Sequence, residues 1–259
     1  MEAGYDTNTY GFTFGADTQV QPKLRLGAAI SYLDGSADAK GDALSASNDY
    51  QTYGIQGYGA YDLTDTMRLV GTMGWFHSKN DMTQTIARAN VAKAEADSDA
   101  DAFTMSLRAE KDFDVNGFAV TPYAGLRAGY MMNDDYTTKV DGADAFKNDQ
   151  DNTFTVQMPI GVVVSKSFDT ASGWTLAPTA DVAIVPQFGD TDYNTTVTGV
   201  GTGVAQTLNA DMAGNVLGQA KLGLRAINKQ TELSASYGLT AGDAGRQDHA
   251  FTLGVSYKF

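Results

Sequence analysis

The sequence predicts an all-β protein, an antiparallel up-and-down transmembrane β-barrel of which about eleven strands are visible. Three observations support this fold class. Apolar side chains alternate with small or polar ones along most of the chain, short turns alternate with long polar connections, and glycine and aromatic residues are abundant while proline is scarce. The 259 residues include 28 Gly, 13 Tyr, 12 Phe and 5 Pro. No stretch approaches the roughly 18 to 20 consecutive apolar residues that a membrane-spanning helix requires.

Alternation with a period of two residues defines the predicted strands, each of roughly 9 to 15 residues. The first is YGFTFGADT (10–18), and the clearest is LRLGAAISYL (24–33), where Leu24, Leu26, Ala28, Ile30 and Tyr32 share one face. The later strands place on one face Tyr53, Ile55, Gly57, Gly59 and Tyr61; Met67, Leu69, Met73 and Trp75; Phe103, Met105, Leu107 and Phe113; Phe118, Val120, Leu126 and Tyr130; Phe154, Val156, Met158, Ile160 and Val162; Trp174, Leu176, Val182, Ile184 and Phe188; Val216, Leu222 and Leu224; Leu233, Ala235, Tyr237 and Leu239; and Phe251, Leu253, Val255, Tyr257 and Phe259. Pro159 lies well inside one of these strands, so we expect a bulge or a local break in the ladder there.

The connections alternate in length. Short turns are predicted at TQVQPK (18–23), LTDT (63–66), DVNG (114–117), DTASG (169–173) and NKQ (228–230), and long polar segments near 34–49, 80–99, 133–152, 189–211 and 241–248. A meander with this alternation places the short turns at one end of the barrel and the long loops at the other. Inside the second long segment, the Ala-rich stretch 86–97 could form a helical turn or two.

Alternation alone fits both a soluble barrel with apolar side chains inside and a membrane barrel with apolar side chains facing lipid. Three features favour the membrane barrel. A barrel of about eleven strands is too wide for one layer of side chains to fill. The polar face lacks the dense Lys and Glu of a soluble surface, and aromatic residues gather near the ends of the predicted strands, as in interfacial girdles. The predicted lumen is therefore wet.

The predicted lumen face carries scattered ions. The candidate site residues are Arg25, Arg108, Glu110, Arg127, Asp181 and Arg225. Arg108, Glu110, Arg127 and Asp181 fall on neighbouring or nearby strands, so opposite charges can pair across the lumen instead of facing lipid, where an ion costs about 2 to 4 kcal/mol at mid-depth. Two roles are compatible with this arrangement. Paired ions could stiffen the barrel, or they could hold a polar segment that occupies the lumen.

The composition excludes several kinds of function. Lys+Arg is 18 and Asp+Glu is 31, which gives a formal charge of -13, and there is no cysteine. The acidic balance argues against nucleic acid as a partner, and the lack of cysteine excludes disulfides, thiolate metal sites and cysteine nucleophiles. The only histidines are His77 and His249, and Asp248 precedes His249, but adjacent residues on a strand point to opposite faces. We therefore expect no catalytic site, no metal site and no cofactor.

Strand parity gives an orientation. The last strand, Ala250 to Phe259, follows a long segment and ends at the short-turn end of the barrel, which is periplasmic in outer-membrane barrels. Counting back, the first visible strand runs from the extracellular side to the periplasm. Single-chain bacterial barrels have an even number of strands, so we expect one further strand upstream of this sequence.

The sequence resembles a family in three segments. GYDTNTYGFTFGADTQVQPKLRLGAAISYLDGSADAKG (4–41), YGIQGYGAYDL (53–63) and the closing FTLGVSYKF (251–259) are similar to the carboxy-terminal β-barrel translocator domain of autotransporters, which perform type V secretion. The resemblance extends over essentially all of residues 1–259. It implies a barrel of twelve strands threaded by a helix, with the first strand and that helix upstream of Met1.

The resemblance also implies a function, partners and a location. The chain would anchor and assist the export of its own upstream passenger domain, as a monomeric barrel in the outer-membrane lipid of a Gram-negative bacterium, with the long loops extracellular and the C-terminus periplasmic. The terminal strand would be the signal that the barrel assembly machinery reads, carried by Phe251, Leu253, Val255, Tyr257 and Phe259. Two other functions stay open: a diffusion porin, and an outer-membrane hydrolase of the omptin type built on His249.

Overall fold

The computed structural model describes residues 4–40, 44–86, 92–190, 192–211, 214–242 and 246–258, and the strands in these ranges form a single antiparallel β-sheet. The described residues contain no helix that is long and apolar enough to cross a bilayer. Eleven crossing strands build the sheet: β1 (Gly4–Gln21), β2 (Leu24–Lys40), β3 (Leu44–Asp62), β4 (Met67–Ile86), β5 (Ala92–Lys111), β7 (Phe118–Asn133), β10 (Thr153–Gln157) continued by β11 (Ile160–Ser165), β13 (Thr175–Gly189), β16 (Val216–Asn228), β17 (Thr231–Gly242) and β18 (Gln247–Tyr257). This confirms the predicted fold class and strand number.

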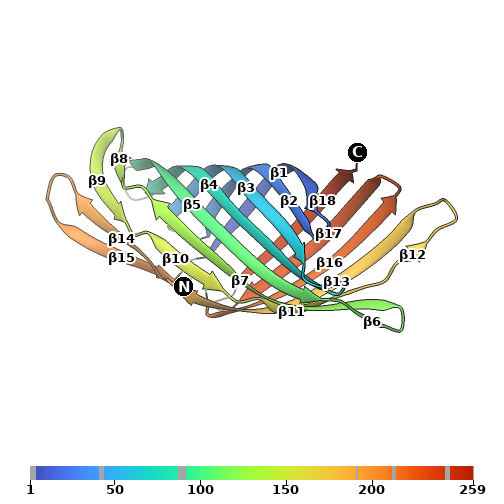
Figure 1. The fold of residues 1–259 in the computed structure, drawn as a ribbon. Helices are drawn as coiled ribbons and strands as arrows, with labels where there is room; N and C mark the ends of the chain where they lie inside the picture. The colour runs from blue at the N-terminus through green and yellow to red at the C-terminus, as the bar shows by residue number, and fades with distance from the viewer. Residues whose placement is uncertain are drawn as a thin grey trace.

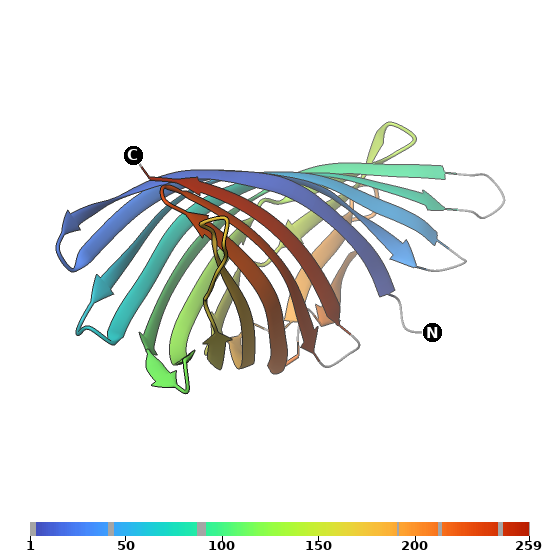
Figure 2. The same ribbon diagram turned by 90° about the vertical axis from the view of Figure 1, so that its right-hand side faces the viewer.

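Each crossing strand pairs with the next one along the chain, as an up-and-down meander requires. The sheet is strongly curved, so that β18 returns toward β1 (Figures 1 and 2). Among the described residues, β1 pairs with β2 and β18 pairs with β17, and no pairing joins β1 to β18. The described sheet therefore has two edges.

The turns gather at one end as predicted. Short connections and the C-terminus lie on the right in Figure 1, and the longer hairpins lie on the left. One of the two-residue turns joins β6 (Phe113–Val115) to β7 through Asn116 and Gly117, whose φ angles are 55° and 77°. Two successive left-handed residues with the sequence Asn-Gly form the hairpin turn whose twist matches that of the flanking strands. A second short piece, β12 (Phe168–Asp169), extends the sheet at the same end.

Most of the described residues in the long polar segments belong to strands, so the prediction that these segments are loops was wrong for them. Strands β4 and β5 contain 20 residues each and continue well beyond the apolar run. Residues 136–150 form a hairpin of β8 (Tyr136–Val140) and β9 (Ala143–Gln150), and residues 192–211 form a hairpin of β14 (Asp192–Gly199) and β15 (Ala205–Asp211). Strand β9 pairs with β14, so the two hairpins extend the sheet together.

The predicted helical turn within 86–97 is also wrong for the part that is described. Residues 92–97 belong to β5 and pair with β4, whereas residues 87–91 lie outside the described residues. Alanine alternates with a charged residue along this segment, so a strand puts every alanine on one face and every charge on the other. That period of two outweighs the helix propensity of alanine.

At Pro159 the ladder is interrupted but the register is kept. Gln157 lies opposite Arg127, and Ile160 lies opposite Ala124, so both strands contain the same number of residues across the gap. The Met158 amide donates to the Pro186 carbonyl and the Gly125 amide donates to the Pro159 carbonyl, each at 2.9 Å. The predicted local break is confirmed, and no bulge accompanies it.

The two faces of the sheet differ as a membrane barrel requires. Apolar side chains on the convex face are exposed, for example Phe14 at 67%, Met73 at 65% and Leu253 at 71%. The buried cluster lies on the opposite face and is small: Tyr123, Ala183, Val185 and Leu217. Large hydrophobic residues therefore point outward, and the concave face is lined by smaller and polar residues.

The polarity of the outward face reverses along the same strands. Rings of Phe12, Tyr32 and Tyr53 form an aromatic row across β1, β2 and β3, with centroids 5.8 and 5.2 Å apart. Two residues farther along, the outward row is Asp34, Gln51, Lys79 and Asp99, which lie opposite one another on β2, β3, β4 and β5. The aromatic row thus marks the end of the apolar run and not, as predicted, the end of the strands.

Candidate functional site

The candidate site is a chain of contacts on the concave face, formed by Glu110 and Arg108 on β5, Tyr123 on β7 and Asp181 on β13, and is called here the lumen network. Arg108 Nη2 lies 2.7 Å from Glu110 Oε2. The Arg108 guanidinium stacks on the Tyr123 ring, 4.9 Å from its centroid. The Tyr123 hydroxyl donates a hydrogen bond of 2.8 Å to Asp181 Oδ1. The network therefore links three crossing strands, β5, β7 and β13, through contacts between side chains alone.

Tyr123 is the centre of the network because the local sequence leaves room for its ring. Only 7% of this residue is exposed. Gly161 on β11 lies directly beside it, and a Cβ at Gly161 would stand 2.6 Å from the Tyr123 hydroxyl oxygen. A glycine is needed here so that the hydroxyl can pass over β11 and reach Asp181 on the next strand. Arg108 Nε is buried and has no hydrogen-bond partner.

The other predicted lumen ions are also on the concave face, but with different partners. Arg25 Nη1 lies 2.7 Å from Asp17 Oδ1, and the Tyr58 hydroxyl donates to Asp17 Oδ2 at 3.4 Å. Arg225 Nη1 lies 3.9 Å from Glu232 Oε1. Arg127 is exposed and lies opposite Ser106 and Gln157. The structure therefore brings Arg108 and Glu110 together directly, reaches Asp181 only through Tyr123, and places Arg25 and Arg225 in separate pairs.

Sequence reasoning missed Tyr123, Asp17 and Glu232. Tyr123 carried a usable signal, since it is a large aromatic residue at a position where the alternation assigns the lumen face. Asp17 and Glu232 are acidic residues on the lumen face of strands adjacent to their arginines. They could not be matched to their partners because the register between strands was not known.

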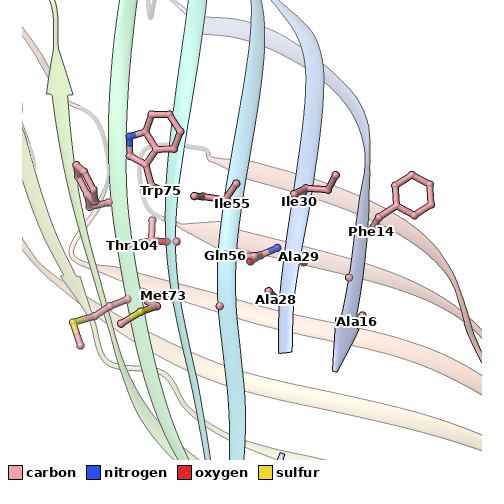
Figure 3. A pocket seen from close by; sticks show the side chains of 15 residues that line it. Phe14, Ala16, Ala28, Ala29, Ile30, Ile55, Gln56, Met73, Trp75 and Thr104 are labelled. Atoms are coloured by element: carbon pink, nitrogen blue, oxygen red, sulfur yellow. The ribbon is translucent and has the colours of Figure 1, made fainter. Parts of the chain in front are cut away.

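The outward face carries a hollow of about 940 Å³ across β1 to β5. Phe14, Ile30, Ile55 and Trp75 form a row of large side chains along its upper side (Figure 3). Ala16, Ala28 and Met73 lie in the row below (Figure 3). The two alanines have small side chains and leave the backbone close to the surface. The hollow is open to the side of the barrel, so its surroundings are those of the apolar outer face.

The terminal strand β18 presents its predicted signal residues outward. The exposed fractions are 70% for Phe251, 71% for Leu253, 78% for Val255 and 56% for Tyr257. Phe259 lies outside the described residues. The four described residues share one face of β18. This strand pairs with β17 along one edge, and its second edge has no partner in the described sheet.

Neither histidine belongs to the lumen network. His249 Nδ1 lies 2.6 Å from the Tyr237 hydroxyl on the outward face, whereas the neighbouring Asp248 points to the other face and pairs with Arg246 at 2.8 Å. His77 Nδ1 lies 3.1 Å from Asp101 Oδ1, and its ring stacks on Trp75. The described contacts thus separate Asp248 from His249 and place His77 at the upper edge of the apolar face.

Comparisons with known proteins agree with this geometry. The sequence is 26% identical over 264 residues to the extracellular serine protease of Serratia marcescens, covering 99% of this chain and 24% of that protein. The translocator domain of the autotransporter NalP from Neisseria meningitidis has a TM-score of 0.75 at 17% identity, covering 98% of this chain and 82% of that chain. The beta domain of the Bordetella autotransporter BrkA has a TM-score of 0.68 at 18% identity, covering 98% of this chain and 92% of that chain.

The family follows from the sequence model of the autotransporter beta-domain, which matches residues 2–238. The likeness to the solved structures supports the same barrel fold. This chain spans about a quarter of the Serratia relative, so the comparison concerns the barrel and not that whole protein. The chain belongs to the autotransporter β-domain family.

Proposed function

We propose that this chain is the outer-membrane translocator of a larger protein, which it anchors and whose upstream passenger domain it helps to export to the cell surface. The observation that carries the proposal is the pairing of an apolar convex face with a concave face of fixed ions within one family-matched barrel. The convex face suits outer-membrane lipid, and the concave face suits a polar polypeptide in transit.

The lumen network and the separate Arg127 would serve two different purposes. The ion pair and the hydrogen bond of the network stiffen the wall across β5, β7 and β13, and the exposed guanidinium of Arg127 adds a charge that is free to meet a passing segment. Because these ions face a wet lumen, each exposed contact contributes little by itself, about 0 to 1 kcal/mol. A polypeptide could therefore slide past them without being held.

The positions of the turns support a proposed orientation of the barrel. The short turns and the C-terminus would face the periplasm, and the β8–β9 and β14–β15 hairpins would project outside the cell (Figure 1). Strand β18, with Phe251 to Tyr257 outward, would be recognised by the barrel assembly machinery.

The two edges of the sheet support a further strand. Unpaired backbone groups are costly in lipid, and β1 and β18 each lack a partner on one side among the described residues. An upstream strand placed between them would close a monomeric barrel, and an upstream helix would then lie in its lumen. Cysteines introduced into the upstream segment and into β18 should form a disulfide in the full-length protein if this pairing exists.

The barrel itself would carry no substrate chemistry. In a porin a long segment folds inward as a constriction, but here β8, β9, β14 and β15 pair with one another and extend the sheet. A hydrolase of the omptin type would use His249, whose ring instead contacts Tyr237 on the outward face. Activity that is lost in His249→Ala, or sustained conductance in a planar bilayer, would revive these alternatives.

The test of the export function uses the full-length protein in a Gram-negative host, with an epitope in the upstream segment. Protease added to intact cells should remove the epitope while the barrel stays protected. Arg127→Glu should lower surface display although the barrel remains folded, whereas the matched charge reversal Lys147→Glu on the outer side of β9 should not. An epitope that stays inside cells carrying a folded barrel would contradict export, and unchanged display and stability in Arg127→Glu would remove both roles of the lumen ions.

A further inference from the structure

Two lysines on the outward face lie against aromatic rings at the short-turn end of the barrel. Lys166 Nζ lies 4.5 Å from the centroid of Phe118 and 5.6 Å from that of Phe168. Lys111 Nζ lies 5.1 Å from the centroid of Phe113. These five residues are called here the lysine–aromatic cluster. Lys111 ends β5, Phe113 begins β6, Phe118 begins β7, Lys166 directly follows β11, and Phe168 begins β12.

Strand pairing makes the cluster continuous. Val115 on β6 lies opposite Phe118 on β7, and Ser165 on β11 lies opposite Ala119, so Lys166 follows directly beside Phe118. The three rings are partly exposed, at 45% for Phe113, 42% for Phe118 and 49% for Phe168. Exposed rings, each with an ammonium group over its face, therefore lie at the boundary between the apolar face and the turns.

The acidic residues next to the cluster in the sequence each accept a hydrogen bond from a donor other than the two lysines. Asp112 Oδ1 accepts from the Thr121 hydroxyl at 2.6 Å, and Asp169 Oδ1 accepts from the Thr175 hydroxyl at 2.7 Å. Asp114 Oδ1 accepts from the Gly117 amide in the turn at 3.2 Å. None of the ion pairs between described residues includes Lys111 or Lys166. Both ammonium groups therefore keep hydrogen-bond donors for an external acceptor.

We infer that the lysine–aromatic cluster binds the phosphate of a membrane phospholipid headgroup in the leaflet at the short-turn end. The inference rests on the proposed insertion of the barrel in the outer membrane. Rings at this depth lie at the border of the hydrocarbon, and a lysine there extends its chain along apolar surface while its ammonium reaches the headgroups. The ring faces hold each ammonium in place by a cation–π contact, so less side-chain freedom is lost when a phosphate binds.

The size of the effect follows from surface electrostatics. A lysine near an anionic membrane surface contributes a factor of about fivefold in binding, so two lysines acting together give roughly 25-fold to 30-fold. The rings should increase lipid binding further, because they hold the ammonium groups in position. Phe118→Leu keeps the apolar side chain and the charge of Lys166 but removes the ring face, and it should reduce retention by a smaller factor than the loss of both lysines.

The experiment measures lipids retained by the full-length protein, purified in detergent, by native mass spectrometry. The probes are phosphatidylglycerol and a diacylglycerol with the same acyl chains. Wild-type protein should retain phosphatidylglycerol over diacylglycerol, the double variant Lys111→Gln with Lys166→Gln should lose that preference by about 25-fold, and the matched control Lys23→Gln at the same end should not. Equal retention by the double variant and the wild type would overturn the proposal.

Two controls separate the possible failures. Glycerol phosphate at millimolar concentration tests for a soluble phosphate, and full competition by it would mean that the lipid is not the ligand. Protease protection of the barrel in intact cells reports insertion independently of lipid binding. A protected barrel that shows no lipid preference would contradict only the lysine–aromatic cluster, and an unprotected wild-type barrel would contradict the proposed function itself.

Discussion

A lysine placed on the outward face of β5 should destabilise the barrel far more than a lysine placed one residue earlier on the inward face. Met105 points outward and is 59% exposed, whereas the adjacent Thr104 points into the lumen and is also exposed. Thr104 lies opposite two glycines, Gly74 and Gly129, so the lumen has room for a longer side chain there. Met105→Lys and Thr104→Lys therefore add the same charge on the two faces of a single strand.

The magnitude follows from the position of Met105 in the apolar run. Between Asp101 and Lys111, the outward residues of β5 are uncharged, and Met105 lies near the middle of that run. A lysine at mid-depth in lipid costs about 2 to 4 kcal/mol, because its charge loses contact with water. Methionine and lysine are similar in length, so the substitution adds little steric strain to this cost. In the wet lumen the same charge should cost less than about 1 kcal/mol.

The assay is reversible denaturant unfolding of the protein in lipid vesicles, followed by the fluorescence of its 2 tryptophans. A loss of about 2 to 4 kcal/mol corresponds to a shift of roughly 30-fold to 1000-fold in the unfolding equilibrium for Met105→Lys. If Thr104→Lys destabilises as much as Met105→Lys, or if Met105→Lys has no effect, then the assignment of the two faces is wrong.

Three further substitutions test the fold and the lumen network by the same unfolding assay. Tyr123→Phe removes the donor to Asp181 and should lower the free energy of unfolding by about 1.5 to 3 kcal/mol, and an unchanged value would mean that water replaces the hydroxyl without loss. Gly161→Ala should lower the free energy of unfolding by about 1 to 3 kcal/mol, because the added Cβ would lie 2.6 Å from the Val182 carbonyl oxygen. The control is Gly238→Ala, which has open space around it and should leave the free energy of unfolding nearly unchanged. Gly117→Ala, at a φ of 77°, should cost about 1 to 2 kcal/mol, and a neutral result would contradict the turn geometry.

The alternation of side chains was sufficient to predict which residues of the clearest strands face outward. Every second residue from Leu24 to Tyr32 and from Phe251 to Tyr257 lies outward as expected, because successive residues of a strand point to opposite faces and the position of one therefore gives the others. The lengths of the strands could not be predicted, because beyond Tyr32 the outward residues become acidic and resemble a loop. Alanine on the inner face was the signal that the strand continues, as at Ala37 and Ala39.

The lumen network was only partly predictable. Arg108 and Glu110 share a face of one strand, so their pairing follows from local geometry. The link from Tyr123 to Asp181 crosses β11 and depends on the absence of a side chain at Gly161, which is a property of three aligned strands. Strand register depends on exact turn positions, and the first turn begins after Gln21 and not at Thr18, which keeps Asp17 within β1 beside Arg25.

The change from aromatic to charged outward residues along β2 to β5 also determines how deep the barrel lies in the bilayer. A shift of two residues toward the lipid, roughly 5 Å along the membrane normal for a tilted strand, would submerge Asp34, Lys79 and Asp99 at the same time. An equal shift outward would lift the rings of Phe12, Tyr32 and Tyr53 into water. A bilayer would thus hold the barrel at one height, and in the proposed orientation the β8–β9 and β14–β15 hairpins would lie at a constant distance from the membrane surface.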